Sequence, residues 1–223
     1  MKLLALETVD ISASAAILED AEVIREISLP PEKKSAQFLT PMISELLNDA
    51  GWTPADVELV ALPIGPGSFT GLRVGVTFAK TFAYITGSAV IGLNTLDILA
   101  AAVPECFPYV SAVMDAQRNQ VIARKYTGKT PCDEMRLLDF DAWAATLDAQ
   151  TAVTGPILKR YGKLLPAEIP QVPEEFWRIS PAFIGKMAYE MFLASRRDSV
   201  WDMLPIYARQ SAAEERLMEA RRK

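Results

Sequence analysis

Glycines and hydroxyl side chains crowd one junction between a predicted strand and a predicted helix. The stretch consists of Gly65, Pro66, Gly67, Ser68, Phe69, Thr70, Gly71, Leu72, Arg73, Val74 and Gly75. Such a junction lets backbone N–H groups converge on a phosphate or a carboxylate, and the positive end of the helix dipole favours the anion. The lysine of a P-loop is missing. The glycines could equally serve a tight turn and close packing of the helix, so the residues leave both interpretations open.

The absence of histidine excludes many other chemistries. The chain has 223 residues and no histidine. It therefore cannot form a Ser-His-Asp or Cys-His nucleophile, a histidine-ligated metal site or an imidazole switch near neutral pH. Any acid–base group must be an Asp, Glu, Lys, Tyr or Cys side chain. We expect no catalytic residue and no metal site in this chain.

The composition is that of a soluble globular protein with no excess of basic residues. Half of the residues (50%) are hydrophobic, 23% are charged, and the formal net charge is -5. This charge weighs against nucleic-acid binding by the chain alone. Two cysteines, Cys106 and Cys132, are too few for a disulfide framework and favour a cytoplasmic location. A charge interrupts every long apolar run, so we expect no membrane span.

Hydrophobic periodicity predicts the elements that must position these residues. The expected strands cover residues 3–9, 11–18, 23–29, 59–64, 89–93, 109–116, 120–126 and 152–155, and the expected helices cover residues 35–50, 70–86, 95–103, 139–147 and 181–195. Pro41 falls inside the first helix and predicts a bend or an irregular first turn there. Residues 163–181 are rich in proline and are expected to be irregular. The C-terminal end is expected to be a charged helix or a frayed tail.

The order of these elements predicts an α/β fold. A meander of three antiparallel strands leads into alternating strands and helices, which gives a mixed sheet with helices on its faces. This order fits the two-lobed, actin-like and ribonuclease H-like (ASKHA) fold of hexokinases and sugar kinases. Residues 1–104 would form an N-terminal ribonuclease H-like lobe with partner-binding helices, and residues 105–223 a smaller C-terminal α/β lobe.

In that fold, carboxylates at strand ends hold magnesium and nucleotide phosphate. Glu7 and Asp10 lie near the end of the first strand, and Asp115 lies near the end of a later one. We therefore regard Glu7, Thr8 and Asp115 as candidate nucleotide and magnesium residues. The alternative is that they are ordinary turn acids.

The helix expected at residues 70–86 is apolar on nearly all sides. Only Arg73 and Lys80 carry charge within it. A helix of this kind is buried, so either the sheet and a neighbouring helix cover it or a second chain does. We expect the isolated chain to form a homodimer through this helix and the helix at residues 35–50. The candidate partner-interface residues are Leu39, Met42, Gly71, Val74, Gly75 and Phe78.

Several segments together resemble the TsaB (YeaZ-like) family. The stretch from Gly65 to Gly75 is similar to the signature of that family, and further similar segments lie at residues 4–8, 39–43, 112–118 and 205–209. The resemblance includes a Leu-x-Pro-x-Ile pattern around Pro41 and a closing Pro-x-Tyr-x-Arg pattern at residues 205–209. The similar segments are spread over most of the chain, although residues 132–202 match little of the family pattern.

The resemblance implies an actin-like fold and a non-catalytic scaffold or activator subunit of the complex that makes threonylcarbamoyladenosine (t6A) on tRNA. It implies that the chain binds and activates a TsaD-like catalytic homologue, the threonylcarbamoyltransferase. A TsaE-like ATPase would join them, and tRNA would be met only through the complex. The chain would require no cofactor of its own, with weak ATP and magnesium binding at the complex interface as the one nucleotide contact.

Two other functions remain open at this point. Glu7, Asp10 and Asp115 motivate an active ATP-dependent kinase of the same fold. Against it, residues 8–12 contain no glycine for a phosphate loop, and Glu7 stands where the family has Asp. A peptidase, as in the older name M22 glycopeptidase for this group, is disfavoured because it needs metal-binding histidines.

Overall fold

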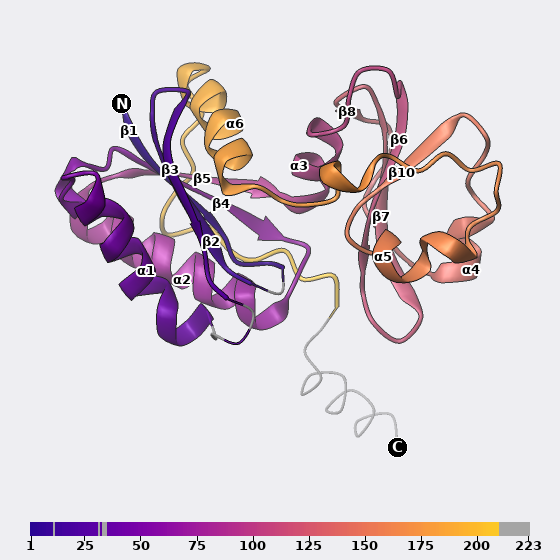
Figure 1. Cartoon of the computed structure of the whole chain (residues 1–223), viewed down its shortest axis with the longest axis horizontal. Coiled ribbons are helices and arrows are strands. Elements are labelled where there is room, and N and C mark those ends of the chain that lie inside the picture. The colour runs from indigo at the N-terminus through magenta and orange to yellow at the C-terminus, as the bar shows by residue number, and fades with distance from the viewer. Residues whose placement is uncertain (11, 31, 33–34, 210–223) are drawn as a thin grey trace.

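The computed structural model describes residues 1–209 except residues 11, 31, 33 and 34, and at residues 35 and 36 it describes the backbone alone (Figure 1). The strands are β1 (Lys2–Glu7), β2 (Ser14–Glu19), β3 (Glu22–Ser28), β4 (Leu59–Gly65), β5 (Ala89–Asn94), β6 (Tyr109–Asp115), β7 (Gln120–Thr127), β8 (Thr130–Pro131), β9 (Arg136–Asp139) and β10 (Thr151–Thr154). The helices are α1 (Ser35–Asp49), α2 (Phe69–Thr86), α3 (Thr95–Ala101), α4 (Phe140–Ala144), α5 (Leu158–Tyr161) and α6 (Pro181–Leu193). The expected C-terminal charged helix lies outside the described residues.

The first sheet is mixed, with the strand order β3-β2-β1-β4-β5. Strands β1, β2 and β3 form the expected antiparallel meander, whereas β4 and β5 continue the sheet parallel to β1. Strand β1 lies at the centre of the sheet, and its residues from Leu3 to Glu7 are buried. The turn after β1 therefore lies in the middle of one sheet edge, where neighbouring elements can approach it.

Helices cover both faces of this sheet (Figure 1). Helices α1 and α2 pack on one face around a core that contains Leu46, Val60 and Val76. Helices α3 and α6 lie on the other face, where Leu96 and Ile184 join a second core. Pro41 lies inside α1, which covers the range expected for this helix, and the bend or irregular first turn expected there stays a prediction.

The second sheet has the order β10-β6-β7-β8, and β9 pairs with β7. Alternate residues of β6 face different cores. Val110 and Ala112 point toward the core that contains α3, while Val113 packs with Phe140 and Trp143 of the α4 region. The two-lobed α/β fold expected from the sequence is thus confirmed.

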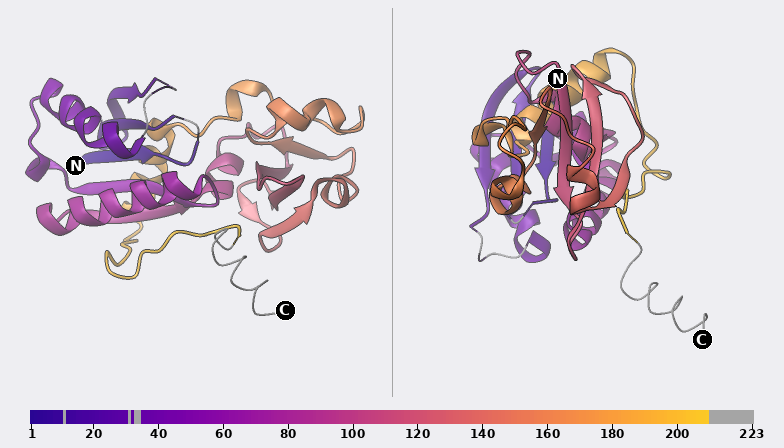
Figure 2. Two further views of the ribbon diagram at one scale, coloured as in Figure 1. Left: turned by 90° about the horizontal axis from the view of Figure 1, so that it is seen from below. Right: turned by 90° about the vertical axis from the view of Figure 1, so that its right-hand side faces the viewer.

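The chain returns to the first lobe after building the second sheet. Helix α6 packs on β1 and β2, which lie early in the sequence. Beyond it, the Asp198 backbone N–H donates to the Val90 carbonyl oxygen over 3.0 Å, and Ile206 N–H donates to the Ile64 carbonyl oxygen over 2.6 Å. Figure 2 shows this last segment running alongside α2. Residues 181–206 therefore complete the first lobe. The division near residue 104 stays a prediction for the part of the chain before residue 181.

Every helix among the described residues is too short or too polar to span a lipid bilayer. Both cysteines are exposed and unpaired.

Candidate functional site

The glycine-rich stretch packs the beginning of α2 against the turn that follows β1. A side chain at Gly71 would overlap the Thr8 carbonyl oxygen, and a side chain at Gly75 would overlap the Thr8 hydroxyl. The helix is capped by Ser68, whose Oγ accepts a hydrogen bond from the Gly71 backbone N–H over 3.2 Å. Gly71 and Gly75 therefore allow close packing inside the lobe, as one of the two interpretations of the sequence expected.

The exposed residues of the same stretch hold the closing segment of the chain. The Phe69 and Tyr207 rings lie 4.8 Å apart between centroids, and the Arg73 guanidinium lies 4.2 Å from the Phe69 centroid. Arg73 Nε also donates to the Tyr207 hydroxyl over 3.1 Å. These contacts give Phe69 and Arg73 a structural role, since they bring residues 205–209 across the first turn of α2.

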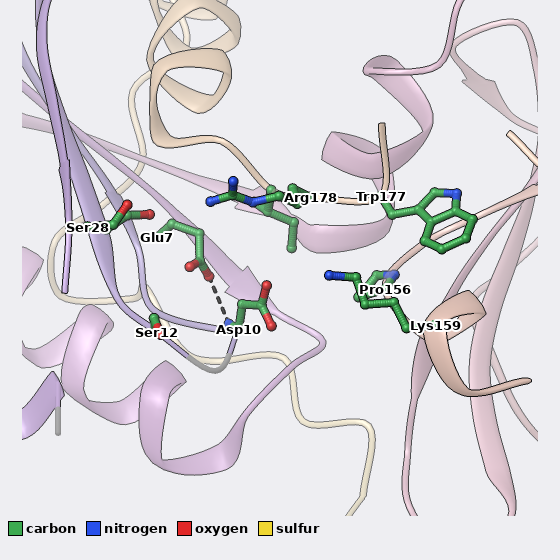
Figure 3. Close-up of a pocket in the computed structure, with 10 residues that line it drawn as sticks. Glu7, Asp10, Ser12, Ser28, Pro156, Lys159, Trp177 and Arg178 are labelled. Atoms are coloured by element: carbon green, nitrogen blue, oxygen red, sulfur yellow. Dashed lines mark hydrogen bonds between the residues drawn. The ribbon is translucent and has the colours of Figure 1, made fainter. Parts of the chain in front are cut away.

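A cleft of about 300 Å³ lies between the two lobes (Figure 3). One wall comes from the end of β1 and the beginning of β2, and the opposite wall comes from α5 and the connection that precedes α6. The lining residues are Glu7, Asp10, Ser12, Ser14, Ser28, Pro156, Lys159, Trp177, Arg178 and Ile179. The cleft thus carries both carboxyl and cationic side chains.

Glu7 is the buried titratable group of this cleft. Its Oε1 accepts hydrogen bonds from the backbone N–H groups of Val9, over 2.5 Å, and Asp10, over 2.9 Å. Only 2% of the residue is exposed. Burial away from water raises the pKa of Glu7 to about 8, although the two backbone hydrogen bonds and the Arg178 charge oppose this shift. Glu7 is therefore largely neutral at pH 7 and holds the turn after β1 in place.

These residues do not fit a magnesium site. Magnesium binds ionised carboxylates and keeps several waters, whereas burial keeps the Glu7 carboxyl neutral near pH 7. Nowhere in the described part of the chain do three metal-ligating Asp, Glu or Cys side chains come together.

The three candidate nucleotide residues are not brought together. Glu7 lines the cleft, but the Thr8 hydroxyl is buried beneath Gly75 of α2 and has no hydrogen-bond partner among the described residues. Asp115 lies outside the cleft lining: its Oδ1 accepts from the Gln117 backbone N–H over 2.7 Å, and its Oδ2 lies 3.5 Å from an Arg160 guanidinium nitrogen. Nucleotide binding by these residues stays a prediction.

A second recess is an apolar groove between α1 and α2, which we call the α1/α2 groove. One part, of about 340 Å³, is lined by Thr40, Ile43, Ser44, Leu47, Asn48, Pro54, Phe78, Phe82, Ile85 and Thr86. The adjoining part, of about 470 Å³, is lined by Leu39, Thr40, Arg73, Val74, Thr77, Phe78 and Thr81. Within it the Phe78 and Phe82 rings stack 5.6 Å apart, and Ile85 is 75% exposed. Helix α2 thus presents one apolar face to the sheet and a second one to solvent.

The predicted partner-interface residues divide between the core and this groove. The structure buries four of them inside the lobe, namely Leu39, Met42, Gly71 and Gly75. Val74 and Phe78 are half-buried and line the groove. Met42, Gly71 and Gly75 are therefore internal packing residues, whereas Leu39, although buried, also borders the adjoining part of the groove. Contact of these residues with a partner stays a prediction.

The second wall of the cleft could not be found from the sequence. Lys159, Trp177 and Arg178 belong to a short helix and a proline-rich connection that carry no recognisable pattern. Ser12, Ser14 and Ser28 lie near strand ends and look like ordinary turn residues. The one available signal was a pair of adjacent bulky and cationic residues, Trp177 and Arg178, inside an otherwise irregular stretch.

Comparison with known proteins identifies relatives over much of the chain. The family model described as TsaD, tRNA N6-adenosine threonylcarbamoyltransferase, matches residues 23–214. The tRNA threonylcarbamoyladenosine biosynthesis protein TsaB of Bacillus subtilis is 34% identical over 128 residues, which cover 57% of this chain and 54% of that protein. The Escherichia coli protein of the same name is 30% identical over 128 residues, covering 56% and 55%. The matched stretch thus spans about half the length of these curated relatives.

Solved structures share the fold over nearly the whole chain. YeaZ from Pseudomonas aeruginosa has a TM-score of 0.75 at 22% identity and covers 92% of this chain and 99% of that one. The activator of the 2-hydroxyisocaproyl-CoA dehydratase from Clostridium difficile has a TM-score of 0.51 at 6% identity, covering 89% and 99%. Both likenesses concern the fold alone. The family model shows that the chain belongs to the TsaD family as that model defines it, and the curated relatives place it with the TsaB proteins.

Proposed function

We propose that the chain is a non-catalytic activator subunit for the formation of t6A on tRNA, and that it binds a TsaD-type threonylcarbamoyltransferase through the α1/α2 groove. The names of its Bacillus subtilis and Escherichia coli relatives support the pathway. The observation that carries the proposal is the solvent-facing apolar stripe of α2, where Phe78, Phe82 and Ile85 lie beside α1. Exposed apolar surface of this kind marks protein contacts in soluble proteins.

The contents of the inter-lobe cleft support a role without catalysis. Its buried carboxyl, Glu7, is held by two backbone N–H groups and is largely neutral at pH 7. We propose that the chain requires no cofactor of its own and that any ATP and magnesium bind weakly at the interface of the complex. A TsaE-like ATPase and tRNA would join through the complex, in the cytoplasm. Activation would then consist in stabilising the active conformation of the transferase, because a partner shifts a conformational equilibrium by its differential affinity for the two states.

Reconstitution of the reaction tests this proposal. The mixture contains the transferase and the ATPase of the same organism, the enzyme that supplies the threonylcarbamoyl adenylate, tRNA, ATP, threonine and bicarbonate, and only this chain is varied. We expect omission of the chain to abolish most t6A formation and Asp115→Asn to leave it within a few-fold. Loss of activity in Asp115→Asn while the complex still assembles would contradict the proposal. Phosphoryl transfer from Mg-ATP to a small acceptor by the isolated chain would favour a kinase instead.

A charge in the α1/α2 groove is expected to prevent partner binding. Phe78→Glu places a carboxylate in an apolar recess that a partner would cover, and an unpaired charge buried at an interface costs several kcal/mol, about 3 or more. We expect at least about a hundredfold weaker capture of the transferase, as measured by co-purification and by biolayer interferometry. Val74→Glu should act in the same direction because Val74 lines the adjoining part of the groove.

Leu193→Glu provides the matched control. Leu193 is 64% exposed and ends α6, on the other face of the sheet from the groove. Leu193→Glu should leave capture of the transferase unchanged.

We also propose that two copies pair through the groove when no transferase is present, burying about 800 Å² on each copy as stable pairs do. Sedimentation should then give a dimer for the unmodified chain and for Leu193→Glu, and a monomer for Phe78→Glu; a monomeric unmodified chain at high micromolar concentration would refute the pairing.

A further inference from the structure

The two walls of the inter-lobe cleft differ in chemistry, since one carries carboxyl groups and the other carries cationic groups. Glu7 and Asp10 lie on the wall that the end of β1 provides, and Lys159 and Arg178 lie on the wall that α5 and the following connection provide. Figure 3 shows the Arg178 guanidinium extending toward Glu7 and the Lys159 ammonium extending toward Asp10. A ligand that enters this space therefore meets acceptors on one side and cationic donors on the other.

Each wall has hydrogen-bonding atoms that the described residues leave unpaired and that a ligand could use. Within the described part of the chain, the Arg178 guanidinium makes no hydrogen bond and no ion pair, although it has five N–H donors. Among the residues that the structure describes, Lys159 pairs with Glu174 alone, at 3.7 Å and in an exposed pair that contributes little. On the other wall, the backbone N–H groups occupy Glu7 Oε1, and its Oε2 accepts no hydrogen bond from the described residues. An arginine whose planar guanidinium group is unpaired can bind a carboxylate through two hydrogen bonds.

We propose that the cleft binds a small zwitterion of the α-amino acid class, with its ammonium group against the Glu7 and Asp10 wall and its carboxylate on Arg178. A simple anion would pair with Arg178 but face the carboxyl groups, and a simple cation would face the guanidinium. A molecule that carries both charges satisfies both walls at once. The inference does not depend on the proposed role in t6A formation.

The size and the lining of the cleft narrow the ligand further. At about 300 Å³ the cleft is at the small end of the range for ligand pockets. The hydroxyl groups of Ser12, Ser14 and Ser28 line it beside the charges, which suits a hydroxylated side chain. A nucleoside triphosphate is larger, and its phosphates would be brought next to two carboxyl groups. The small hydroxy amino acids, L-serine and L-threonine, are therefore the probes of choice.

Binding of the ammonium group should be coupled to ionisation of Glu7. The charged groups that face this carboxyl are Asp10 and Arg178, and the pKa of Glu7 is raised to about 8 in the free protein. A positive ligand group beside it favours the ionised form, so binding near neutral pH releases a proton from Glu7. The affinity should therefore increase as the pH rises toward about 8, below the pH at which the ligand amine itself loses its proton.

Titration calorimetry on the full chain tests the inference. We expect L-serine and L-threonine to bind at about pH 7.5, and two matched analogues of serine to bind at least about tenfold more weakly. These analogues are 3-hydroxypropanoate, which lacks the amine, and ethanolamine, which lacks the carboxylate. Repeating the serine titration in two buffers of different ionisation enthalpy should reveal proton release. Equal binding of 3-hydroxypropanoate and serine, binding of Mg-ATP in place of the amino acids, or no binding of any of these probes would each overturn the proposal.

Two variants locate the ligand in this cleft. Arg178→Gln should weaken serine binding at least about tenfold, because it removes the charge that holds the ligand carboxylate. Arg160→Gln is the matched control, since Arg160 is exposed and its partner is Asp115, which is outside the cleft lining. The control should bind serine like the unmodified chain. Unchanged binding in Arg178→Gln would place the ligand elsewhere and overturn the assignment, and the ligand panel on the unmodified chain tests the ligand class whether or not the variants fold.

Discussion

Gly75→Ala is expected to destabilise the protein, and Thr8→Ala in the same chain is expected to restore more than half of the lost stability. A methyl group on Gly75 would overlap the Thr8 hydroxyl. Overpacking of this kind costs about 1–3 kcal/mol and exceeds the helix-propensity gain of about 1 kcal/mol from glycine to alanine. Thr8→Ala removes the overlapping hydroxyl, which has no hydrogen-bond partner in the described structure and therefore adds no stability through one.

Gly71→Ala separates side-chain overlap from backbone overlap. A methyl group on Gly71 would meet the Thr8 carbonyl oxygen, which no substitution at Thr8 removes. We expect Gly71→Ala to cost at least as much as Gly75→Ala, about 2–4 kcal/mol, and to be rescued by Thr8→Ala by less than about 0.5 kcal/mol. Urea unfolding of the single and double variants measures both couplings. Equal rescue at both positions would show that α2 shifts as a rigid body and that the two separate contacts with Thr8 do not decide the outcome.

The same packing predicts a loss of activity. A charged side chain at Gly71 or Gly75 cannot be placed between α2 and the turn after β1, so α2 must move away from the sheet. Because α2 supplies Val74 and Phe78 to the α1/α2 groove, Gly71→Glu should abolish t6A formation in the reconstituted reaction. Tyr84→Ser, at an exposed position of the same helix outside the lining of the groove, should retain activity if α2 keeps its place.

The first lobe was largely predictable because its signals are local. Alternation and turn residues determine the meander of β1 to β3, and the apolar spacing with Gly87 at its end determines α2. Helix α1 was predicted despite the proline inside it, since the rest of the helix keeps its apolar stripe. Strands β8 and β9 and helix α5 were missed because each is short and carries no periodic pattern.

Only the Glu7 wall of the cleft could be predicted from the sequence. Glu7 ends a recognisable strand, so its place at a sheet edge follows from the sequence. Arg178 reaches the same place only because the chain crosses back from the second sheet to α6, and that crossing depends on long-range packing of α6 on β1 and β2. The outward faces of helices could not be assigned either: Met42 and Val74 are both apolar residues of predicted helices, yet Met42 is buried in the core and Val74 lines a groove.

The stability of the protein is expected to fall as the pH rises from about 5 to about 8, and Glu7→Gln is expected to remove most of this fall. The pKa of Glu7 is about 8 in the folded protein, against an ordinary value of 4.5. Between these values the folded state holds a proton that the unfolded state has released, so unfolding becomes easier as the pH rises. The stabilising effect of this proton is complete below about pH 4.5 and is lost as the pH approaches 8.

The size of this effect follows from the displacement of the pKa, because each unit corresponds to about 1.4 kcal/mol. Over the interval from about pH 5.5 to about pH 8 the difference in unfolding free energy between Glu7→Gln and the unmodified chain should change by about 3 kcal/mol in favour of the variant. Glutamine resembles the neutral carboxyl, and its side-chain oxygen can still accept from the Val9 and Asp10 backbone N–H groups. Urea unfolding at several pH values measures the slope, and Asp115→Asn, which alters a carboxylate outside the cleft lining, should retain the slope of the unmodified chain. If Glu7→Gln and the unmodified chain show the same slope, Glu7 is ionised in the folded protein at pH 7. The conclusion that the cleft contains a neutral carboxyl group would then be wrong.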